Sequence, residues 1–595
     1  GDSVNNLSTD LLFYEKYSYK LLAHNSAALA KLLMLNFTSF PPLHSAYYPW
    51  NRTFEIGLEL NAIEDLTSSG NASPFSNEQT VFCDVIIGGG STSALAAAFA
   101  AADEGPSLSV CLLEPTSWPG GQLTSSLVTA LDFGKLNRKI QCLPKLFAQY
   151  LEQNKYPQNP GNCWVSTFCY EAEDILNSFI FPELKKRENL HVYLNTVVSR
   201  VITSKSFISN IVAITRTAKS NYTLSIPYSQ QVTDWYSSQD SADFFKTIYT
   251  FSRTPKTSPI VIDATENGDL LALSGAPFIQ GNELNESSFE SLQTCGQGIA
   301  FTMYMSIDQE NKEMGTHQGG KGGGPNIANN YSLGKYDWEN VWSYRRVENP
   351  KTTLIAWGST NGDGNDWPYS YHLLPVKEAR KQDPWVGGLN LTTLQRAEEY
   401  ALGFAKWYME KGLSSGMPPA KLINSSKVVG TMTGLAQLPY IRDSRRSIGL
   451  NQFRLKATDL AKGKMFNDRV ALGDYIYFDA HSMQGCPAIN FTDFGPLQPY
   501  YIPLRALTSN GFSNLLVAGK TMAQTNAANA ATRFQPVEWS SGTASGVFAS
   551  FLLNERMKGN NISIAGVCSE CQADEGLCAL QTRVAEYNPL DWSCA

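Results

Sequence analysis

Three consecutive glycines, Gly88 to Gly90, stand between the apolar run that begins at Val85 and an alanine-rich run. In a Gly-x-Gly-x-x-Gly fingerprint the first glycine permits a tight turn and the second lets the backbone approach a pyrophosphate. The third lets the helix pack closely on the strand. These positions are Gly88, Gly90 and Ser93 here, and serine is small enough for the third. The spacing predicts a dinucleotide site, with a purely structural glycine turn as the alternative.

An acidic residue after the next apolar run supports the dinucleotide interpretation. The fingerprint expects a carboxylate about 20 residues further on, where it accepts hydrogen bonds from a ribose. Glu114 directly follows the apolar stretch at 108–113 and takes this place. The helix after the turn would also present free backbone N–H groups and a positive dipole end to the diphosphate.

A histidine and several arginines are the first candidates for catalysis. His481 stands in the loop-like sequence YFDAHSMQG, which favours an acid–base role. An exposed or structural histidine is the alternative, and Asp479 can orient His481 only if the backbone between them is not extended. Arg445, with Arg442 and Arg446 in RDSRR, can bind a substrate carboxylate or stabilise a cofactor. The alternative is that these arginines form a charged run on the protein surface.

The elements that must position these residues follow a βαβ pattern. An apolar strand is expected at 82–87, a helix at 91–102 and a second strand at 108–113, which predicts a parallel main sheet. Later strands are expected at 191–203, 211–218, 222–226, 258–263 and 514–519, followed by a helix at about 537–553. Residues 10–36 have helical apolar spacing, and 66–80 have the composition of a polar linker.

The composition is that of a folded protein with several domains. The 595 residues exceed one ordinary core, and 43% of them are hydrophobic against 17% charged. The net charge of −7 argues against nucleic-acid binding, which favours a basic surface. No apolar run approaches the roughly 18 residues that a membrane span requires.

Potential N-glycosylation sites occur along the whole chain. The tripeptide Asn-x-Ser/Thr stands at Asn6, Asn36, Asn51, Asn71, Asn221, Asn285, Asn330, Asn390, Asn424, Asn490 and Asn561. We interpret this distribution as a surface adapted to N-linked glycans, and hence as a secreted or secretory-pathway protein. The alternative is that asparagine and threonine are simply abundant.

The cysteines also favour an oxidising compartment. One group is Cys142, Cys163 and Cys169, and a tail group is Cys568, Cys571, Cys578 and Cys594. Clusters in polar sequence predict disulfides. Zinc is the alternative for the tail, which contains a CxxC, but no histidine lies nearby and we expect no metal site. Cys83 and Cys111 fall in predicted buried strands and are expected to be free, inert core residues.

Four segments carry a family resemblance. They are VIIGGGSTSALAAAFAA…VCLLEPTSWPGGQLT, PIVIDATENGDLLALSGAPF, YIRDSRRSIG and NLLVAGKTMAQTNAANAATRFQPVEWSSGTASGVFA. They resemble the FAD-dependent oxidoreductases of the glutathione-reductase-like (GR2-type) class, in a subgroup without a well-assigned substrate. The resemblance covers roughly residues 81 to 555. It implies FAD, held by a nucleotide-binding fold that a substrate domain interrupts.

The resemblance also implies cofactor roles for individual residues. They are Gly88, Gly90, Ser91, Thr92 and Ser93 at the diphosphate, Glu114 and Pro115 at the adenosine ribose, Val198 at adenine, Ala264 and Thr265 on the adenosine side, Gly121, Gln122 and Leu123 near the ribityl–flavin end, and Gly519 at the ribityl and phosphate region. A helix starting near Pro536 and Val537 would point its N-terminus at the flavin, and Arg533 and Glu538 flank that start. We add Arg533 to the catalytic candidates. The second segment departs from the common ATGDGD, since it reads ATENGD with Glu266 and Asn267.

The reaction is inferred from two redox motifs that we do not find in the sequence. Reductases that use NAD(P)H usually carry a second glycine fingerprint, and the other glycine cluster, GGKGGGPN at Gly319, opens no helix. No CxxC pair stands beside the FAD segments, which disfavours a disulfide reductase. We therefore predict an oxidase that passes electrons from a small organic substrate to O2 and yields H2O2. The alternatives are a flavoprotein with non-redox or photochemical work, or a secreted binding glycoprotein with vestigial FAD.

The expected fold class is α/β, with a parallel Rossmann-like FAD-binding domain interrupted by a mixed α+β substrate domain. The expected domains are an N-terminal extension and linker at 1–80, an FAD-binding domain at 81–134, 165–281 and 503–555, a substrate or cap domain at 135–164 and 282–502, and a cysteine-containing tail at 556–595. Trp367, Tyr369 and Tyr371 are candidates to line a substrate pocket, although buried aromatic residues more often belong to a core.

Overall fold

A computed structural model describes residues 78–594, apart from 135–138, 155–162, 164, 221, 254–257, 307–330, 332–344, 350–351, 358–365, 415–419 and 570–574. The helix expected at 10–36 lies outside the described residues, as do most of the linker at 66–80 and the glycine cluster at Gly319.

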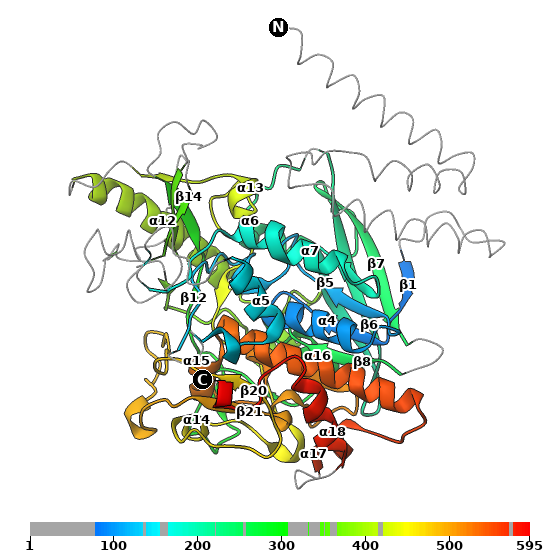
Figure 1. Ribbon diagram of the computed structural model, residues 1–595. Coiled ribbons are helices and arrows are strands. Elements are labelled where there is room, and N and C mark those ends of the chain that lie inside the picture. The colour runs from blue at the N-terminus through cyan, green and yellow to red at the C-terminus, as the bar shows by residue number, and fades with distance from the viewer. Residues whose placement is uncertain are drawn as a thin grey trace, which may run out of the picture. The chain divides into compact units, whose positions relative to one another are not determined.

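A five-stranded parallel sheet carries the glycine turn (Figure 1). Its strands, in spatial order, are β22 (Leu515–Val517), β8 (Ile260–Asp263), β2 (Val85–Gly88), β3 (Val110–Leu113) and β4 (Leu190–Tyr193). All neighbouring strands pair in parallel. The sequences VIIG of β2 and IVID of β8 are buried throughout, as strands covered on both faces require. The predicted α/β class with a Rossmann-like parallel sheet is confirmed.

Two long helices, α4 (Thr92–Glu104) and α16 (Gln535–Met557), lie side by side against this sheet (Figure 1). Small residues make their close contact possible. A Cβ atom at Gly542 would stand 2.2 Å from the carbonyl oxygen of Ser93, so any larger residue there would push the helices apart. The start of α4 is thereby fixed between β2 and α16.

A second sheet stands next to the parallel one. Its strands, in spatial order, are β1 (Glu78–Phe82), β7 (Phe244–Ser252), β6 (Phe207–Ala218) and β5 (Thr196–Ser204). The strand predicted at 222–226 is wrong, because these residues form bends. The Thr223 and Ser225 hydroxyls bond to each other, and such local side-chain bonds compete with a strand ladder.

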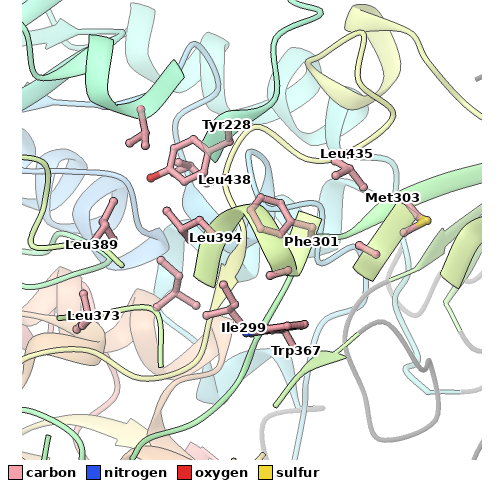
Figure 2. Packing of buried hydrophobic residues seen from close by; sticks show 14 of the residues in the cluster. Tyr228, Ile299, Phe301, Met303, Trp367, Leu373, Leu389, Leu394, Leu435 and Leu438 are labelled. Carbon is pink, nitrogen blue, oxygen red and sulfur yellow. The ribbon is translucent and has the colours of Figure 1, made fainter. Parts of the chain in front are cut away.

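A third group of elements surrounds a large apolar cluster. Its members are α8 (Tyr228–Trp235), β12 (Ile299–Ala300), β13 (Met303–Ser306), β14 (Arg346–Asn349), β15 (Thr352–Trp357), β16 (Asp366–Trp367), α12 (Leu391–Ser414), β17 (Lys421–Leu422) and β18 (Tyr440–Ile441). Ile299, Phe301 and Trp367 point into the cluster together (Figure 2). β12 pairs with both β16 and β18, so Asp366 and Tyr440 are both register partners of Ala300. The predicted domain boundaries stay a prediction.

Shorter elements complete the described fold. They include η1 (Gly121–Leu123), α5 (Lys145–Gln153), α6 (Ala172–Ile175), α7 (Phe181–Lys185), α9 (Asp269–Ser274), β9 (Phe278–Ile279), β10 (Asn282–Glu283), β11 (Ser291–Leu292), α11 (Val376–Ala379), α13 (Ser426–Val429), β19 (Arg446–Ser447), α14 (Ala457–Ala461), β20 (Arg469–Gly473), β21 (Tyr500–Pro503), η7 (Gly519–Thr521), α15 (Asn526–Thr532), α17 (Ile564–Ser569) and α18 (Glu575–Val584). No helix among the described residues is long and apolar enough to cross a membrane.

Disulfides tie these elements together. The pairs among the described residues are Cys83–Cys111, Cys142–Cys594, Cys163–Cys169 and Cys295–Cys486. The prediction that Cys83 and Cys111 are free is wrong. The parallel pairing of β2 with β3 brings the Cα atoms of the two cysteines to 6.1 Å, a distance that a disulfide spans. Cys571 lies outside the described residues, and the zinc alternative for the tail is weakened because Cys594 pairs with Cys142.

Candidate active site

The turn between β2 and α4 is held from several sides. Gly90 has a φ of +106°, which favours glycine, and it forms an isolated bridge with Thr265. Ser91 is the N-cap of α4: its hydroxyl accepts from the Ala94 N–H at 3.1 Å and donates to the Ala264 carbonyl at 2.6 Å. The turn and the loop after β8, both predicted to bind the cofactor, therefore meet.

Two further glycines approach the start of α4 from distant parts of the chain. Gly121 has a φ of +58°, and a Cβ there would stand 2.6 Å from the Ser91 Cα. Gly519 has a φ of +65°, and a Cβ there would stand 2.3 Å from the Ser93 Oγ. Only glycine fits at either position. We call Gly88–Ser93, Gly121 and Gly519 the glycine cradle, which offers backbone rather than side chains to a ligand.

Glu114 completes the cradle at the end of β3. Its carboxyl is 1% exposed and accepts from the Thr116 N–H at 3.1 Å and the Thr116 hydroxyl at 2.8 Å. Burial raises its pKa to about 8, against the opposing effect of the Thr116 and Gly90 hydrogen bonds. A buried carboxyl of this kind is suited to accept hydrogen bonds from ribose hydroxyls. The Thr196 N–H bonds to the Glu114 carbonyl, which sets β5 and its buried Val198 beside this end of the cradle.

These geometric features agree with a comparison of the whole chain. A family model described as FAD dependent oxidoreductase matches residues 84–228 and 225–570. The chain belongs to this family. It is an oxidoreductase, and its cofactor is FAD. No curated protein matches the chain.

Solved structures resemble this FAD-dependent oxidoreductase only distantly. A geranylgeranyl bacteriochlorophyll reductase-like protein from Thermoplasma acidophilum is 9% identical, with 86% of this chain and 85% of that one covered and a TM-score of 0.30. The p-nitrophenol 4-monooxygenase PnpA from Pseudomonas putida DLL-E4 is 9% identical, with 86% and 91% covered and a TM-score of 0.29.

L-proline dehydrogenase from P. horikoshii is 14% identical, with 36% of this chain and 26% of that one covered and a TM-score of 0.17. The chain thus spans about a quarter of that protein's length. At these TM-scores the likeness does not bear on the fold, and the family assignment rests on the family match.

The glycine cradle fits FAD on observations of the chain itself. Gly121 and Gly519 let two distant loops lie against Ser91 and Ser93 at the start of α4, and Glu114 is a buried acceptor at the predicted ribose end. Thr92, within the cradle, and Leu123, close to Gly121 in the chain, are fully buried, and Pro115 directly follows Glu114. The individual roles toward FAD stay predictions.

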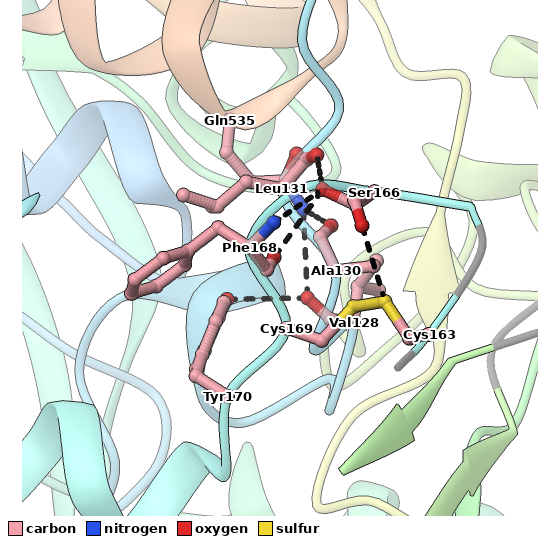
Figure 3. Close-up of a disulfide and its surroundings, with 9 residues drawn as sticks. All are labelled: Val128, Ala130, Leu131, Cys163, Ser166, Phe168, Cys169, Tyr170 and Gln535. Carbon is pink, nitrogen blue, oxygen red and sulfur yellow. Dashed lines mark hydrogen bonds between the residues drawn. A yellow bond between two sulfur atoms is a disulfide. The ribbon is translucent and has the colours of Figure 1, made fainter. Parts of the chain in front are cut away.

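The helix start predicted near Pro536 and Val537 is observed one residue earlier, at Gln535. The Gln535 side chain donates to the Ala130 carbonyl at 3.0 Å and accepts from the Asp132 N–H at 3.2 Å. Ala130 in turn forms an isolated β-bridge with Cys169, so the Cys163–Cys169 disulfide lies near this helix start (Figure 3). The free N–H groups of the first turn of α16 are thus held in a fixed direction.

His481 lies between two carboxylates. Its Nδ1 is 2.8 Å from Asp366 Oδ2, and its Nε2 is 3.3 Å from Asp479. Burial would raise the pKa of Asp366, but Arg442 and His481 outweigh it and hold the value at about 2. The pKa of Asp479 is also lowered, by His481 and Arg533 against the effect of burial. A carboxylate thus stands at each ring nitrogen of His481, where each can accept a hydrogen bond from an imidazole N–H.

Two arginines extend this arrangement. Arg442 donates to Asp366 at 2.8 Å, and Arg533 donates to Asp479 at 2.8 Å. We call Asp366, Arg442, Asp479, His481 and Arg533 the ion cluster. The side chains of Asp366 and Asp479 are 16% and 17% exposed, against 1% for Arg533, so the cluster runs from the surface into the interior.

The buried end of the ion cluster adjoins the glycine cradle. Arg533 donates to the Tyr440 hydroxyl, and its own carbonyl accepts from Gln122 Nε2 at 2.9 Å. Gln122 belongs to the loop predicted to approach the flavin. Burial raises the pKa of Tyr440, so its phenol stays protonated. Among the described residues, no group of His, Cys, Asp and Glu is arranged to hold a metal ion.

Arg445 does not join the other two catalytic candidates. Its guanidinium donates to the Asn267 carbonyl at 2.8 Å and the Gly387 carbonyl at 3.1 Å, and stacks 5.5 Å from the Trp385 ring. Arg442, Arg445 and Arg446 are at most 1% exposed, so the alternative of a charged surface run is wrong. Arg445 instead joins the loop after β8 to the loop before α12.

Sequence reasoning missed Asp366 and Tyr440. Asp366 precedes Trp367 in the aromatic stretch NDWPYSYH, which was the available signal. Of the aromatic candidates there, Trp367 lies in the apolar cluster, and the Tyr371 hydroxyl donates to Asp443 at 2.9 Å. Tyr369 alone of the three is exposed, at 37%.

Proposed function

We propose that this FAD-dependent oxidoreductase is a secreted, glycosylated oxidase of the GR2-type class, acting on a small organic substrate with dioxygen as acceptor. The substrate loses two electrons and two protons, and dioxygen gains them as hydrogen peroxide. FAD, when bound, takes up the two electrons and passes them on.

The ion cluster is the observation that carries this proposal. His481 has a carboxylate at each ring nitrogen, so its protonated form would donate to both. A fixed cation stabilises negative charge that develops on dioxygen as it is reduced, and an imidazolium can donate the proton that peroxide needs. Arg533 adds a second positive charge, directly before the start of α16. In this proposal His481 supplies the acid half of the predicted acid–base role.

The disulfides and sequons support secretion. Four disulfides among the described residues suit an oxidising compartment. Asn285, Asn490 and Asn561 are exposed, whereas Asn424 is 8% exposed. We expect glycans on the three exposed asparagines and none on Asn424. Mass spectrometry of peptides from protein secreted by a eukaryotic host checks this, and a fully glycosylated Asn424 would contradict the described burial.

A substrate screen tests the oxidase proposal. The purified flavoprotein is mixed anaerobically with amines, amino acids, sugars and alcohols, and its visible spectrum is followed. We expect one class to bleach the flavin, and air then to restore the colour with one hydrogen peroxide formed per substrate consumed. Bleaching by NADPH alone, or reoxidation without peroxide, would overturn the proposal.

A further inference from the structure

Three buried charged side chains meet where the sequence departs from the common ATGDGD. Lys520 Nζ lies 2.6 Å from a carboxylate oxygen of Glu538 and 2.9 Å from one of Glu266. The side chains are 1%, 0% and 6% exposed in that order. We call Glu266, Lys520 and Glu538 the charged triad. It brings together η7, the start of α16 and the loop after β8.

The charged triad lines the glycine cradle. A Cβ at Gly90 would stand 3.9 Å from the Glu266 Cγ, and a Cβ at Gly519 would stand 3.5 Å from the Glu538 Cδ. Gly519 also precedes Lys520 in the chain. Two carboxylates and one ammonium therefore face the position at which the fingerprint binds a diphosphate.

Charge balance opposes the docking of FAD onto this arrangement of side chains. The triad carries one net negative charge when all three groups are ionised, and a diphosphate adds two more. Inside a protein such repulsion is strong because little solvent screens it. Lys520 cannot serve both carboxylates and also neutralise the diphosphate. This repulsion, which the N-terminus of α4 offsets only in part, favours a form in which one carboxylate loses its charge or its place when FAD binds.

We propose that Lys520 is a diphosphate-binding residue of the FAD site, and that Glu266 takes up one proton when Lys520 turns from it to the diphosphate. Glu266 has the longer of the two contacts with Lys520 and the closer approach to Gly90. Its pKa is already raised, by burial first and by Glu538, while Lys520 lowers it. Among the described residues, Glu114 at the end of β3 also repels it, and Gly90, before the start of α4, lies against it.

The sign of the pH dependence follows from this exchange. The FAD-bound form holds one more proton than the free form at pH values where free Glu266 is ionised. FAD affinity is therefore constant at low pH and falls about tenfold for each pH unit once free Glu266 has ionised. Replacement of Glu266 by glutamine removes both the proton and the repulsion, so the affinity of E266Q is expected to be higher than that of the wild type and flat with pH.

Calorimetry on the deflavinated protein tests the proposal. FAD is titrated in two buffers of different ionisation enthalpy, between about pH 6 and about pH 9. We expect the wild type to take up about one proton per FAD at the upper end, and E266Q to take up none. Loss of a charged hydrogen bond in K520M should weaken FAD binding by about 10- to 100-fold. The same trend is expected in the release of FAD from the holoenzyme, followed by flavin fluorescence.

Two control variants make the assignment specific. E398Q changes a carboxylate in α12 that is also buried, at 4% exposed, and bonded to Ser229, and it should leave proton uptake and affinity unchanged. E538Q separates the two carboxylates of the triad, and uptake that persists in E266Q but vanishes in E538Q would overturn the assignment to Glu266. A wild type whose FAD affinity does not change with pH would overturn the whole proposal. Because only FAD binding is measured, the result does not depend on the oxidase proposal.

Discussion

The glycine cradle and the ion cluster adjoin each other but are built in opposite ways. The cradle presents backbone, and its glycines are needed because any Cβ would collide at Gly121 or Gly519. The ion cluster presents charged side chains, and β16, β18 and two later segments bring it together. Substitutions in the cradle should therefore be tolerated when the new side chain has the same size. Substitutions in the ion cluster should be tolerated better when they change the size of a side chain than when they change its charge.

The largest effect is expected from removing the charge at His481. H481Q keeps a polar side chain but cannot donate to both Asp366 and Asp479 with a positive charge. We expect reoxidation by dioxygen to slow by about 10²- to 10⁴-fold, with FAD content unchanged. Stopped-flow mixing of the reduced enzyme with oxygen measures this rate.

A second histidine serves as the control for His481. His372 is 1% exposed, and neither of its ring nitrogens has a hydrogen-bond partner among the described residues. Burial lowers its pKa to about 3, so it is neutral. H372Q should leave the reoxidation rate within about threefold of the wild type, well below the effect expected for a general acid. If H481Q and H372Q lowered the reoxidation rate equally, the ion cluster would have no role beyond that of a buried core histidine.

The next largest effect is expected from adding one methyl group to the cradle. G121A combines a left-handed backbone with a Cβ 2.6 Å from the Ser91 Cα. We expect FAD binding to weaken by about 100-fold or more, since a displacement of the cradle costs about 3 kcal/mol. The control is G275A, where φ is +77° but no atom of the described residues lies within 4 Å of the added Cβ, so the protein is destabilised by about 1 kcal/mol without loss of FAD affinity.

The contrast between the two regions also decides what the sequence could predict. Gly88, Gly90, Ser91, Ala264 and Thr265 meet as expected, because the fingerprint encodes a local turn and parallel pairing follows from βαβ order. The partnership of His481 with Asp366 joins residues that are 115 positions apart, and no local pattern encodes it. The same holds for the Cys83–Cys111 pair, which depended on β2 and β3 being neighbours in the sheet.

The variant R445K tests whether Arg445 takes part in the reaction or only stabilises the fold. Lysine keeps its charge but cannot reach the Asn267 and Gly387 carbonyls together. R445K should lower the melting temperature by roughly 2–8 °C, for a cost of about 2 kcal/mol, and leave the turnover of remaining folded enzyme unchanged. R533M should instead lower turnover, because it removes the positive charge that binds Asp479 in the ion cluster. A loss of turnover in R445K at unchanged stability would return Arg445 to the catalytic residues.

The smallest effect is expected where the chain itself departs from the glycine fingerprint. The Ser93 hydroxyl bonds to that of Ser91 at 2.8 Å, but its backbone does the work of the third glycine, since α16 packs against the Ser93 carbonyl at Gly542. S93G restores the common fingerprint and should change FAD affinity by less than about threefold, while the greater freedom of glycine destabilises α4 by about 0.5–1 kcal/mol. FAD titration and thermal unfolding of the same preparation separate the two quantities. A large loss of FAD affinity would mean that the Ser93 side chain itself holds the cofactor, and the cradle would then depend on side chains as the ion cluster does.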